Sequence, residues 1–213
     1  MVLAVFAAPA SAGPIYTFSC ITNNGPGDCA IGEAQLSMEV IDEGGGLVGF
    51  KFSNAVGSAS SITDIYFDDG SLLAISSIVD SGAGVAFSSP ATPPNLPAGN
   101  TASPPFVTTA NLSADSNPPV LANGVNSSTE WVEIKFSLKP GGTYQDVLDE
   151  LASGELRAGL HVQGFRLPDS EHTTSESFIN NSPNSPVPEP GTLLLLGGGL
   201  TGLASRRRRR SGR

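Results

Sequence analysis

Few residues of this 213-residue sequence could carry covalent chemistry. Its two histidines are His161 and His172, and the sequence contains no Gly-x-Ser-x-Gly turn that would present a nucleophilic serine. His161 has the opposite parity to Leu160 and Val162, so we expect it on the outer surface of a strand. His172 lies in a polar loop. The sequence therefore does not predict a serine-hydrolase triad.

Two cysteines, Cys20 and Cys29, are separated by eight residues. Residues 23–28 between them are rich in Asn and Gly, which form turns and would bring the sulfurs together. A zinc site would need two pairs of ligands, and the spacing does not supply them. We predict a disulfide, because the ends of the chain indicate export to an oxidising compartment. Two reduced, buried thiols are the alternative.

The acidic group best suited to a cation is Asp64, Asp68 and Asp69, just before the turn residue Gly70. Oxygen ligands around a turn suit Ca²⁺, although the spacing is not that of an EF-hand loop. Calcium binding is one interpretation, and a solvated hairpin turn is the other. A glycosidase would need two placed carboxylates, and no spacing distinguishes such a pair among the 20 acidic residues. No other cofactor is predicted.

Two aromatic side chains are candidates for stacking on sugar rings. Trp131 is out of phase with the apolar residues Val132 and Ile134, so it could lie on the outer face of its strand. Tyr66 could do the same. Alternatively, one or both rings pack beneath the Pro-rich loops that follow residue 88.

Charge is distributed very unevenly along the chain. Between residues 13 and 186 there are 5 basic and 19 acidic residues, a net charge of −14, whereas six of the eleven basic residues lie between Arg206 and Arg213. An acidic body is repelled by phosphate backbones. We therefore expect no nucleic-acid partner.

The N-terminus resembles a secretory signal. Residues 2–8 form a short apolar run, and Ala10-x-Ala12 has the small-x-small form that signal peptidase cleaves, so residues 1–12 are a predicted signal peptide. No Lys or Arg precedes the apolar run. The true start could therefore lie upstream of Met1.

The C-terminus has a more specific order of segments. A polar linker at 180–186 is followed by Val187-Pro188-Glu189-Pro190 and by an apolar stretch at about 191–205. A basic cluster comes next, formed by Arg206, Arg207, Arg208, Arg209 and Arg210. About 14 apolar residues span roughly 21 Å as a helix, which is short of a hydrocarbon core near 30 Å. The arginines should stay on the cytoplasmic side of the membrane, so we predict a transmembrane helix that stops translocation but is a poor permanent anchor.

This order of motif, short helix and basic cluster resembles the PEP-CTERM sorting signal of Gram-negative bacteria over the last 27 residues. The resemblance implies that Val187–Pro190 is the sorting motif and that Arg206–Arg210 is the membrane stop. It also implies an exosortase-type membrane protease as partner, transient residence in the inner membrane, and delivery to the cell surface or extracellular matrix. An association with exopolysaccharide and biofilm is a further implication.

Alternation of apolar and polar residues predicts strands at 33–40, 48–52, 63–67 and 132–138. Asp69-Gly70 predicts a hairpin that joins 63–67 to 72–79. Residues 88–126 read as long loops around one or two short strands. One helix should begin after Thr143, with Asp146 completing a capping box, and end at Gly154.

A final strand is expected at 155–165, which gives seven or eight strands in all. Residues 13–179 should therefore fold as a mainly-β domain, an antiparallel β-sandwich or jelly roll with one short helix. We expect a non-enzymatic structural or binding protein. The alternative is a secreted carbohydrate-active enzyme with an unrecognised carboxylate pair.

Overall fold

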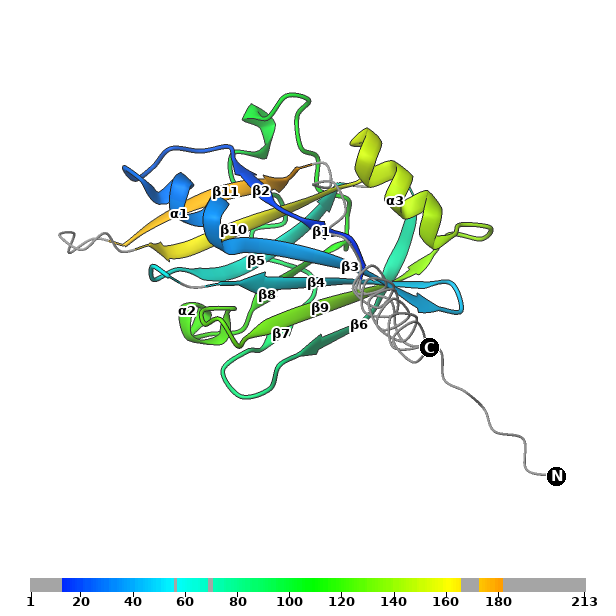
Figure 1. The fold of residues 1–213 in the computed structure, drawn as a ribbon, viewed down its shortest axis with the longest axis horizontal. Helices are drawn as coiled ribbons and strands as arrows, with labels where there is room; N and C mark the ends of the chain where they lie inside the picture. Colours follow the sequence, from blue (N-terminus) through cyan, green and yellow to red (C-terminus); the bar gives the residue numbers. More distant parts are fainter. Residues whose placement is uncertain (1–12, 56, 69–70, 166–172, 182–213) are drawn as a thin grey trace, which may run out of the picture.

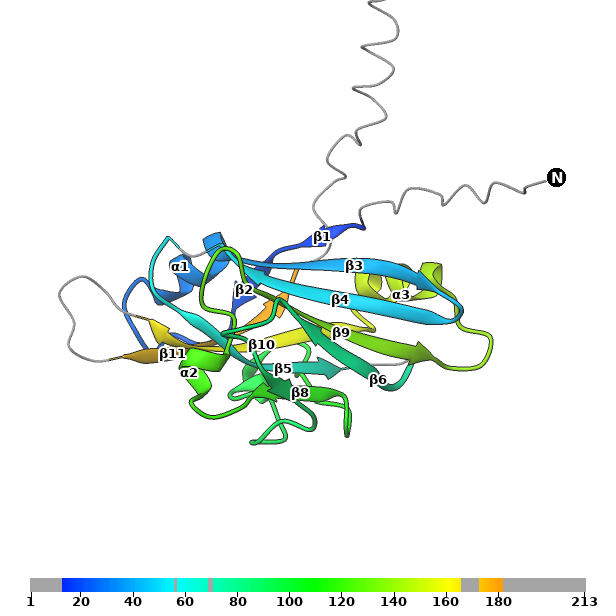
Figure 2. The same ribbon diagram turned by 90° about the horizontal axis from the view of Figure 1, so that it is seen from below.

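The computed structural model describes residues 13–55, 57–68, 71–165 and 173–181. They form two antiparallel β-sheets that pack face to face, as Figures 1 and 2 show. Sheet A contains, in spatial order, β1 (Ile15–Tyr16), β3 (Leu36–Gly44), β4 (Leu47–Asn54), β9 (Trp131–Leu138) and β6 (Leu72–Asp80). Sheet B contains β2 (Phe18–Cys20), β11 (Thr174–Asn180), β10 (Arg157–Phe165), β5 (Ser61–Asp68), β8 (Ser113–Ser116) and β7 (Phe87–Ser88).

The core lies between the sheets and is centred on phenylalanines. Phe67 of β5 contacts Phe50 of β4 and Phe136 of β9 edge to face, with ring centroids 5.0 and 4.7 Å apart. All three rings are completely buried. These contacts join the two layers, and the predicted mainly-β class is confirmed in the two-layered form that a sandwich and a jelly roll share.

The predicted hairpin at Asp69-Gly70 is wrong. β5 pairs with β10 and β8 in sheet B, whereas β6 pairs with β9 in sheet A. The chain therefore crosses from one sheet to the other between residues 68 and 72. Seven of the eight β5 residues are buried, because this strand is covered on both faces and flanked on both sides.

The first predicted strand begins later than expected. Residues 28–35 form helix α1 (Asp28–Gln35), and β3 begins only at Leu36. Leu36, Met38 and Val40 are buried, as the alternation predicted. The alternation was misleading at 33–35, because helix α1 presents its buried Gly32 and Gln35 to the fold at helical spacing.

Helix α3 (Tyr144–Ser153) agrees with its prediction. Thr143 accepts a hydrogen bond from the Asp146 backbone, and the Asp146 side chain accepts one from Thr143, which completes the capping box. Gly154 ends the helix at a φ of 80°, a conformation that favours glycine. The Tyr144 hydroxyl donates to the Val40 carbonyl over 2.9 Å and so fixes the helix to β3.

The described residues contain more elements than the sequence predicted. Strands β7 and β8 are the short strands expected among the long loops of 88–126, whereas helix α2 (Val120–Asn123) and the 3₁₀ turn η1 (Gly99–Thr101) were not predicted there. β11 adds a strand after the one expected at 155–165. Within the described residues, no helix is long and apolar enough to cross a membrane. The predicted signal peptide, and the predicted transmembrane segment at about 191–205, lie outside those residues.

Candidate functional site

The structure joins Cys20 and Cys29 in a disulfide, as the sequence predicted. Cys20 ends β2 and Cys29 lies in the first turn of α1, with their Cα atoms 5.3 Å apart. The turn-rich segment between them folds back over β11. The disulfide therefore fastens helix α1 to the edge of sheet B.

A buried carboxylate organises this disulfide loop. Glu176 of β11 is completely buried, and its Oε1 accepts the backbone N–H groups of Asn24 and Gly25 over 2.6 and 2.8 Å. Its Oε2 accepts the hydroxyl of Thr22 and lies 4.0 Å from the sulfur of Cys20. These bonds satisfy loop N–H groups that would otherwise be orphaned beneath the disulfide.

The structure does not bring Asp64 and Asp68 together as one cation site. Four residues apart on one strand, their Cα atoms are separated by about 13 Å. Asp68 pairs with Arg157 and accepts the Val107 N–H over 3.1 Å. Asp69 lies outside the described residues. Calcium binding by this group stays a prediction.

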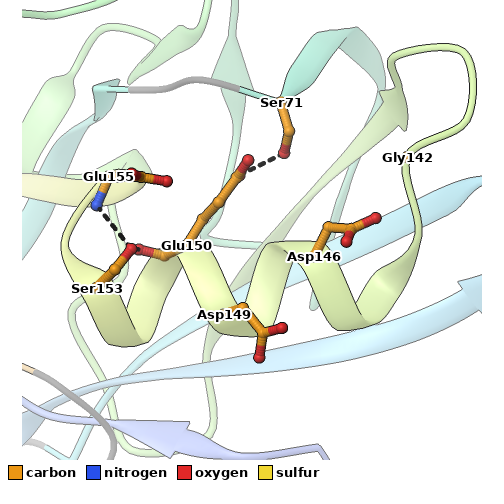
Figure 3. Close-up of a pocket in the computed structure, with 7 residues that line it drawn as sticks. All are labelled: Ser71, Gly142, Asp146, Asp149, Glu150, Ser153 and Glu155. Carbon is orange, nitrogen blue, oxygen red and sulfur yellow. Dashed lines mark hydrogen bonds between the residues drawn. The ribbon is translucent and has the colours of Figure 1, made fainter.

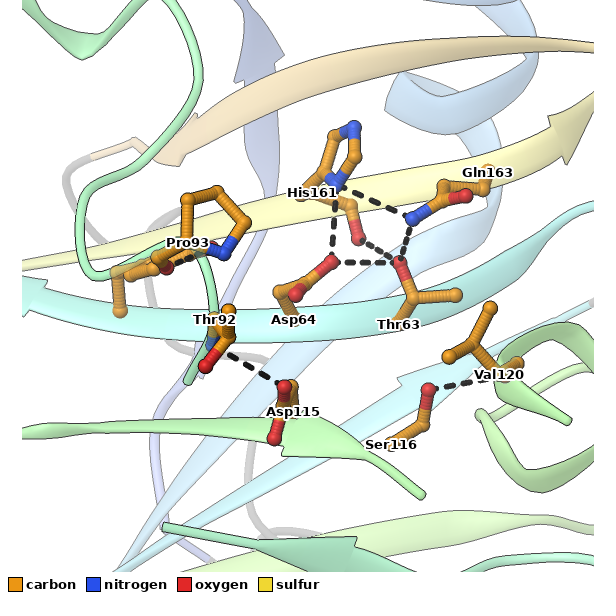
Figure 4. A network of polar contacts seen from close by, with 10 residues as sticks. Thr63, Asp64, Thr92, Pro93, Asp115, Ser116, Val120, His161 and Gln163 are labelled. Carbon is orange, nitrogen blue, oxygen red and sulfur yellow. Dashed lines mark hydrogen bonds and ion pairs between the residues drawn. The ribbon is translucent and has the colours of Figure 1, made fainter. Parts of the chain in front are cut away.

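Asp64 instead belongs to a polar network on the outer face of sheet B, drawn in Figure 4. His161 of β10 faces Asp64 of β5, and its Nδ1 lies 2.9 Å from Asp64 Oδ2. The same carboxylate oxygen accepts the Thr63 hydroxyl over 2.8 Å, and Gln163 donates to Thr63 over 3.0 Å. A β-bulge opposite His161 allows the neighbouring residues Thr63 and Asp64 to reach one network.

His161 was predicted to be a surface histidine, and the structure places it outward but largely covered. Its side chain is 15% exposed and that of Asp64 is 7% exposed. Pairing at Nδ1 leaves Nε2, which Figure 4 shows pointing away from Asp64, available as a base or a metal ligand. Among the described residues, no hydroxyl donates a hydrogen bond to this ring. The network thus contains the histidine and aspartate of a triad without a bonded nucleophile.

A second aspartate lies beside this network. Asp115 of β8 faces Asp64 across the strands and accepts the Thr92 N–H over 3.1 Å. Burial raises the pKa of Asp115, and the charge of Asp64 raises it further. The row His161, Asp64 and Asp115 runs across three neighbouring strands. Its members are distant in sequence, so only the strand order could have revealed it.

Tyr66 does not present an exposed ring for sugars. It is completely buried and packs with Leu96, Phe106 and Ile179 beneath the Pro-rich loop. Its hydroxyl donates to the Pro93 carbonyl over 3.0 Å. The stacking role predicted for Tyr66 is therefore wrong, and the alternative of packing under the loop is confirmed.

Trp131 lies on the opposite layer, at the start of β9. It faces Ser53 of β4 and is half-buried, because the next residue, Val132, takes the inward position. The ammonium of Lys51 lies 4.7 Å from the centre of its ring. Trp131 is thus an aromatic side chain on the outer face of sheet A, with a cation beside it.

The same face carries a pair of carboxylates that the sequence did not single out. Lys135 Nζ lies 2.6 Å from Glu43 and 3.5 Å from Glu133 Oε1. The longer contact is not a hydrogen bond, so Glu133 Oε1 is buried without a hydrogen-bond partner among the described residues. Gly49 permits this position, because a Cβ there would lie 2.2 Å from that oxygen.

The pKa values of the two carboxyl groups are shifted in opposite directions. The hydrogen bond from Lys135 holds the pKa of Glu43 below its usual value. Burial raises the pKa of Glu133, and the nearby Glu43 raises it further. Two carboxyl groups with opposite shifts are typical of acid–base pairs, although structural networks produce them too.

A cavity of about 500 Å³ lies elsewhere, between α3 and the start of β6 (Figure 3). Its acidic lining comes from Asp146, Asp149, Glu150 and Glu155. Glu150 accepts a hydrogen bond from Ser71, whereas Figure 3 shows Asp149 directed away from Ser71. None of the described residues that line this cavity is basic, so it is unsuited to anionic ligands.

Comparison with protein-family models finds the PEP-CTERM protein-sorting motif over residues 186–210. The chain carries a PEP-CTERM sorting motif. No curated protein and no solved structure matches the chain.

The residues that the sequence order assigned to sorting all fall within this match. Val187–Pro190 lies near its start. The match ends with the five arginines that were predicted to form the membrane stop, Arg206, Arg207, Arg208, Arg209 and Arg210. Both groups lie outside the described residues, so the match supports the motif, and the membrane-stop role of these arginines stays a prediction.

The PEP-CTERM motif indicates an exported protein that is processed by an exosortase as it transits a membrane. It agrees with the disulfide, since disulfides persist outside the cytoplasm. The motif covers the tail alone. It therefore indicates where the chain is sorted. It says nothing of what the two sheets bind or catalyse, which has to be inferred from the residues described above.

Proposed function

We propose that the chain is a non-enzymatic protein that an exosortase releases to the cell surface or the exopolysaccharide matrix, where its β-domain binds glycans. The PEP-CTERM motif at residues 186–210 carries this proposal. The disulfide at Cys20 and Cys29 supports it, because such a loop is stable in an oxidising compartment.

Expression in hosts with and without an exosortase tests the sorting step. Cells are fractionated and the mass of the chain in each fraction is measured. We expect a shortened chain outside the cells of the complete host, and a full-length membrane-bound chain in the host without the enzyme. A variant truncated before residue 186 is the control, and in both hosts it should be absent from the membrane fraction. Equal masses for the full chain in both hosts would refute the proposal.

Glycan binding is assigned to the outer face of sheet A. Trp131 provides a half-buried ring with the ammonium of Lys51 beside it, and Lys135 lies further along the same face of β9, so that both ammonium groups can bind hydroxyl or carboxylate groups of sugars. Tyr66 offers no such ring, since it is completely buried.

Binding of the producing cell's exopolysaccharide to the full chain, measured by calorimetry, tests this assignment. Replacing Trp131 by Ala should weaken binding about tenfold or more, as for other buried aromatic contacts. Tyr66→Phe is the matched control, because it alters an aromatic residue of the other sheet and should leave the affinity unchanged. An unchanged affinity for Trp131→Ala, with the fold intact by circular dichroism, would remove sheet A from the proposal.

A carbohydrate-active enzyme is the second candidate, favoured by one observation. Glu43 and Glu133 both contact Lys135 and have pKa values shifted in opposite directions. Release of reducing sugars from the exopolysaccharide would support this candidate, provided that Glu43→Gln and Glu133→Gln each abolish it. Binding without shortening of the polymer supports the non-enzymatic proposal.

A further inference from the structure

Three metal-binding side chains meet at the disulfide loop. Ligand atoms of Cys20, Cys29 and Glu176 all lie within 4.8 Å of one another. They come from β2, α1 and β11, so the fold and not local sequence brings them together. In the part of the chain that the structure describes, no other three such side chains approach this closely.

Glu176 is oriented as a metal ligand would be. It is completely buried, and the N–H groups of Asn24 and Gly25 fix its Oε1. Its Oε2 faces the sulfur of Cys20. Among the described residues, no basic side chain forms an ion pair with Glu176. A buried carboxylate is normally paired with a cation or coordinates a metal, whereas the described residues that bond to Glu176 are all neutral.

A further oxygen lies beside both sulfurs. The carbonyl oxygen of Thr22 is 3.2 Å from the sulfur of Cys20 and 3.0 Å from that of Cys29. Thr22 and both cysteines are half-buried, so an ion can reach them from solvent. Two sulfurs and two oxygens are thus close together, and once the sulfurs separate on reduction, four ligands is the number that suits tetrahedral Zn²⁺.

We propose that the reduced chain binds one Zn²⁺ through the thiolates of Cys20 and Cys29 and the carboxylate of Glu176, and that disulfide formation releases the ion. A dithiol supplies the two electrons and two protons that convert the disulfide to two thiols, and it becomes a disulfide itself. Zn²⁺ then displaces the two thiol protons as both Zn–S bonds form. Oxidation by a disulfide of another molecule reverses both steps. The ion neutralises the repulsion between two thiolates and the buried carboxylate.

Cobalt provides the test, because Co²⁺ bound by thiolates absorbs through sulfur-to-metal charge transfer. The full-length chain is titrated with Co²⁺ alone, after reduction and in its oxidised form. We expect a charge-transfer band that saturates at one Co²⁺ per reduced chain, is displaced by Zn²⁺ and is absent from the oxidised chain. Glu176→Gln should weaken binding about tenfold or more, the loss found when coordination shells are altered.

Glu33→Gln is the matched control. The Glu33 carboxylate accepts the Cys20 backbone N–H over 3.1 Å but lies outside the three-residue group, so its loss should leave affinity unchanged. X-ray absorption of the Zn²⁺-loaded wild-type chain needs no variant, and it should show two sulfurs at about 2.3 Å and oxygen ligands at about 2.0 Å. Absence of charge transfer, three or more sulfur ligands, or equal binding by folded Glu176→Gln would each overturn the proposal.

Discussion

Glu133 combines burial with an unbonded oxygen, and this combination makes its charge unfavourable to the fold. Its pKa is raised in the folded chain, above the ordinary value of 4.5 that the unfolded chain retains. The folded state therefore holds the proton more tightly. Its contribution to stability is complete below pH 4.5 and is lost as the pH rises through the folded pKa.

We accordingly expect Glu133→Gln to stabilise the protein at pH 7. Removing a buried charge whose Oε1 accepts no hydrogen bond should gain on the order of 1 kcal/mol, which is about 2–4 °C in Tm for a domain of this size. Thermal unfolding followed by circular dichroism at pH 7 and pH 4 measures the effect, and the two chains should converge at pH 4. A variant less stable than wild type at pH 7 would mean that the ion pair with Lys135 stabilises the fold by more than the burial of the carboxylate destabilises it.

Residue types alone predicted some of these sites. The cysteine spacing with its turn residues predicted the disulfide, and the phase of Trp131 against Val132 predicted its outward direction. For Tyr66 the same argument gave the outward direction but not the exposure, because a loop from elsewhere in the chain covers the outward side of β5. Asp64 and His161 are 97 residues apart and meet only because β5 and β10 are neighbours. The position of a residue along a strand predicts which face its side chain is on. Whether another part of the chain covers that face depends on the tertiary structure.

Helix α3 depends on its capping box, which is an element signal contained within four residues. Replacing Thr143 by Ala should cost about 1 kcal/mol, since the N–H of Asp146 loses its acceptor at the helix start. Urea unfolding measures the difference. Thr143→Ser retains the accepting oxygen and should lie close to wild type. Equal losses for Ala and Ser would attribute the effect to the lost methyl group and not to the cap.

The disulfide loop is the second element with a definite energetic expectation. Replacing both cysteines by Ser should cost about 2–3 kcal/mol, because even a short closed loop restricts the unfolded chain. Hydrogen exchange should rise in α1, which the disulfide fastens to β2. Alkylation of the exported protein before reduction, followed by mass analysis, should label no thiol. Two labelled thiols per chain would show that the loop is open after export.

Individual helices and strands were easier to predict from the sequence than which strands pair with each other. The capping box and Gly154 defined helix α3, and alternation defined the cores of β3, β4 and β9. Asp69-Gly70 is a strong hairpin signal, yet the strands on either side join different sheets. A turn fixes a reversal of the chain over a few residues. Which sheet receives the next strand depends on apolar surfaces that are distant in sequence.

At the scale of the whole molecule, charge separates the domain from its tail. The body of 13–186 has a net charge of −14, whereas the end of the chain is strongly basic. We expect anionic lipid to repel the body and to attract the arginines, which by the positive-inside rule should stay in the cytoplasm. The PEP-CTERM motif begins where the acidic body ends and extends to Arg210, so its Val187–Pro190 segment lies between these two parts. We therefore expect a processing step at that segment to separate an acidic, disulfide-bonded domain from the part predicted to hold it at the membrane.

The final prediction is that separate residues of this tail halt translocation and direct processing. The apolar stretch of about 14 residues, with its several glycines, is a weak anchor, and the charge of Arg206–Arg210 opposes its passage through the bilayer. Proline lacks the N–H that a helix needs, so Pro188 and Pro190 lead us to expect that no helix continues through Glu189 and that this residue is accessible beside the membrane. Halting and processing should therefore depend on different residues of the tail.

Glu189→Ala should leave insertion intact and block maturation, so that a full-length chain accumulates in the membrane. Deletion of residues 206–210 should instead reduce membrane retention before processing. Asn184→Ala, in the polar linker before the motif, is the control and should mature like the wild type. Fractionation with intact-mass analysis distinguishes these outcomes in a host that contains an exosortase. If the surface form of the wild-type chain still includes Arg206–Arg210, the tail is an anchor, and the separation of domain from membrane does not occur.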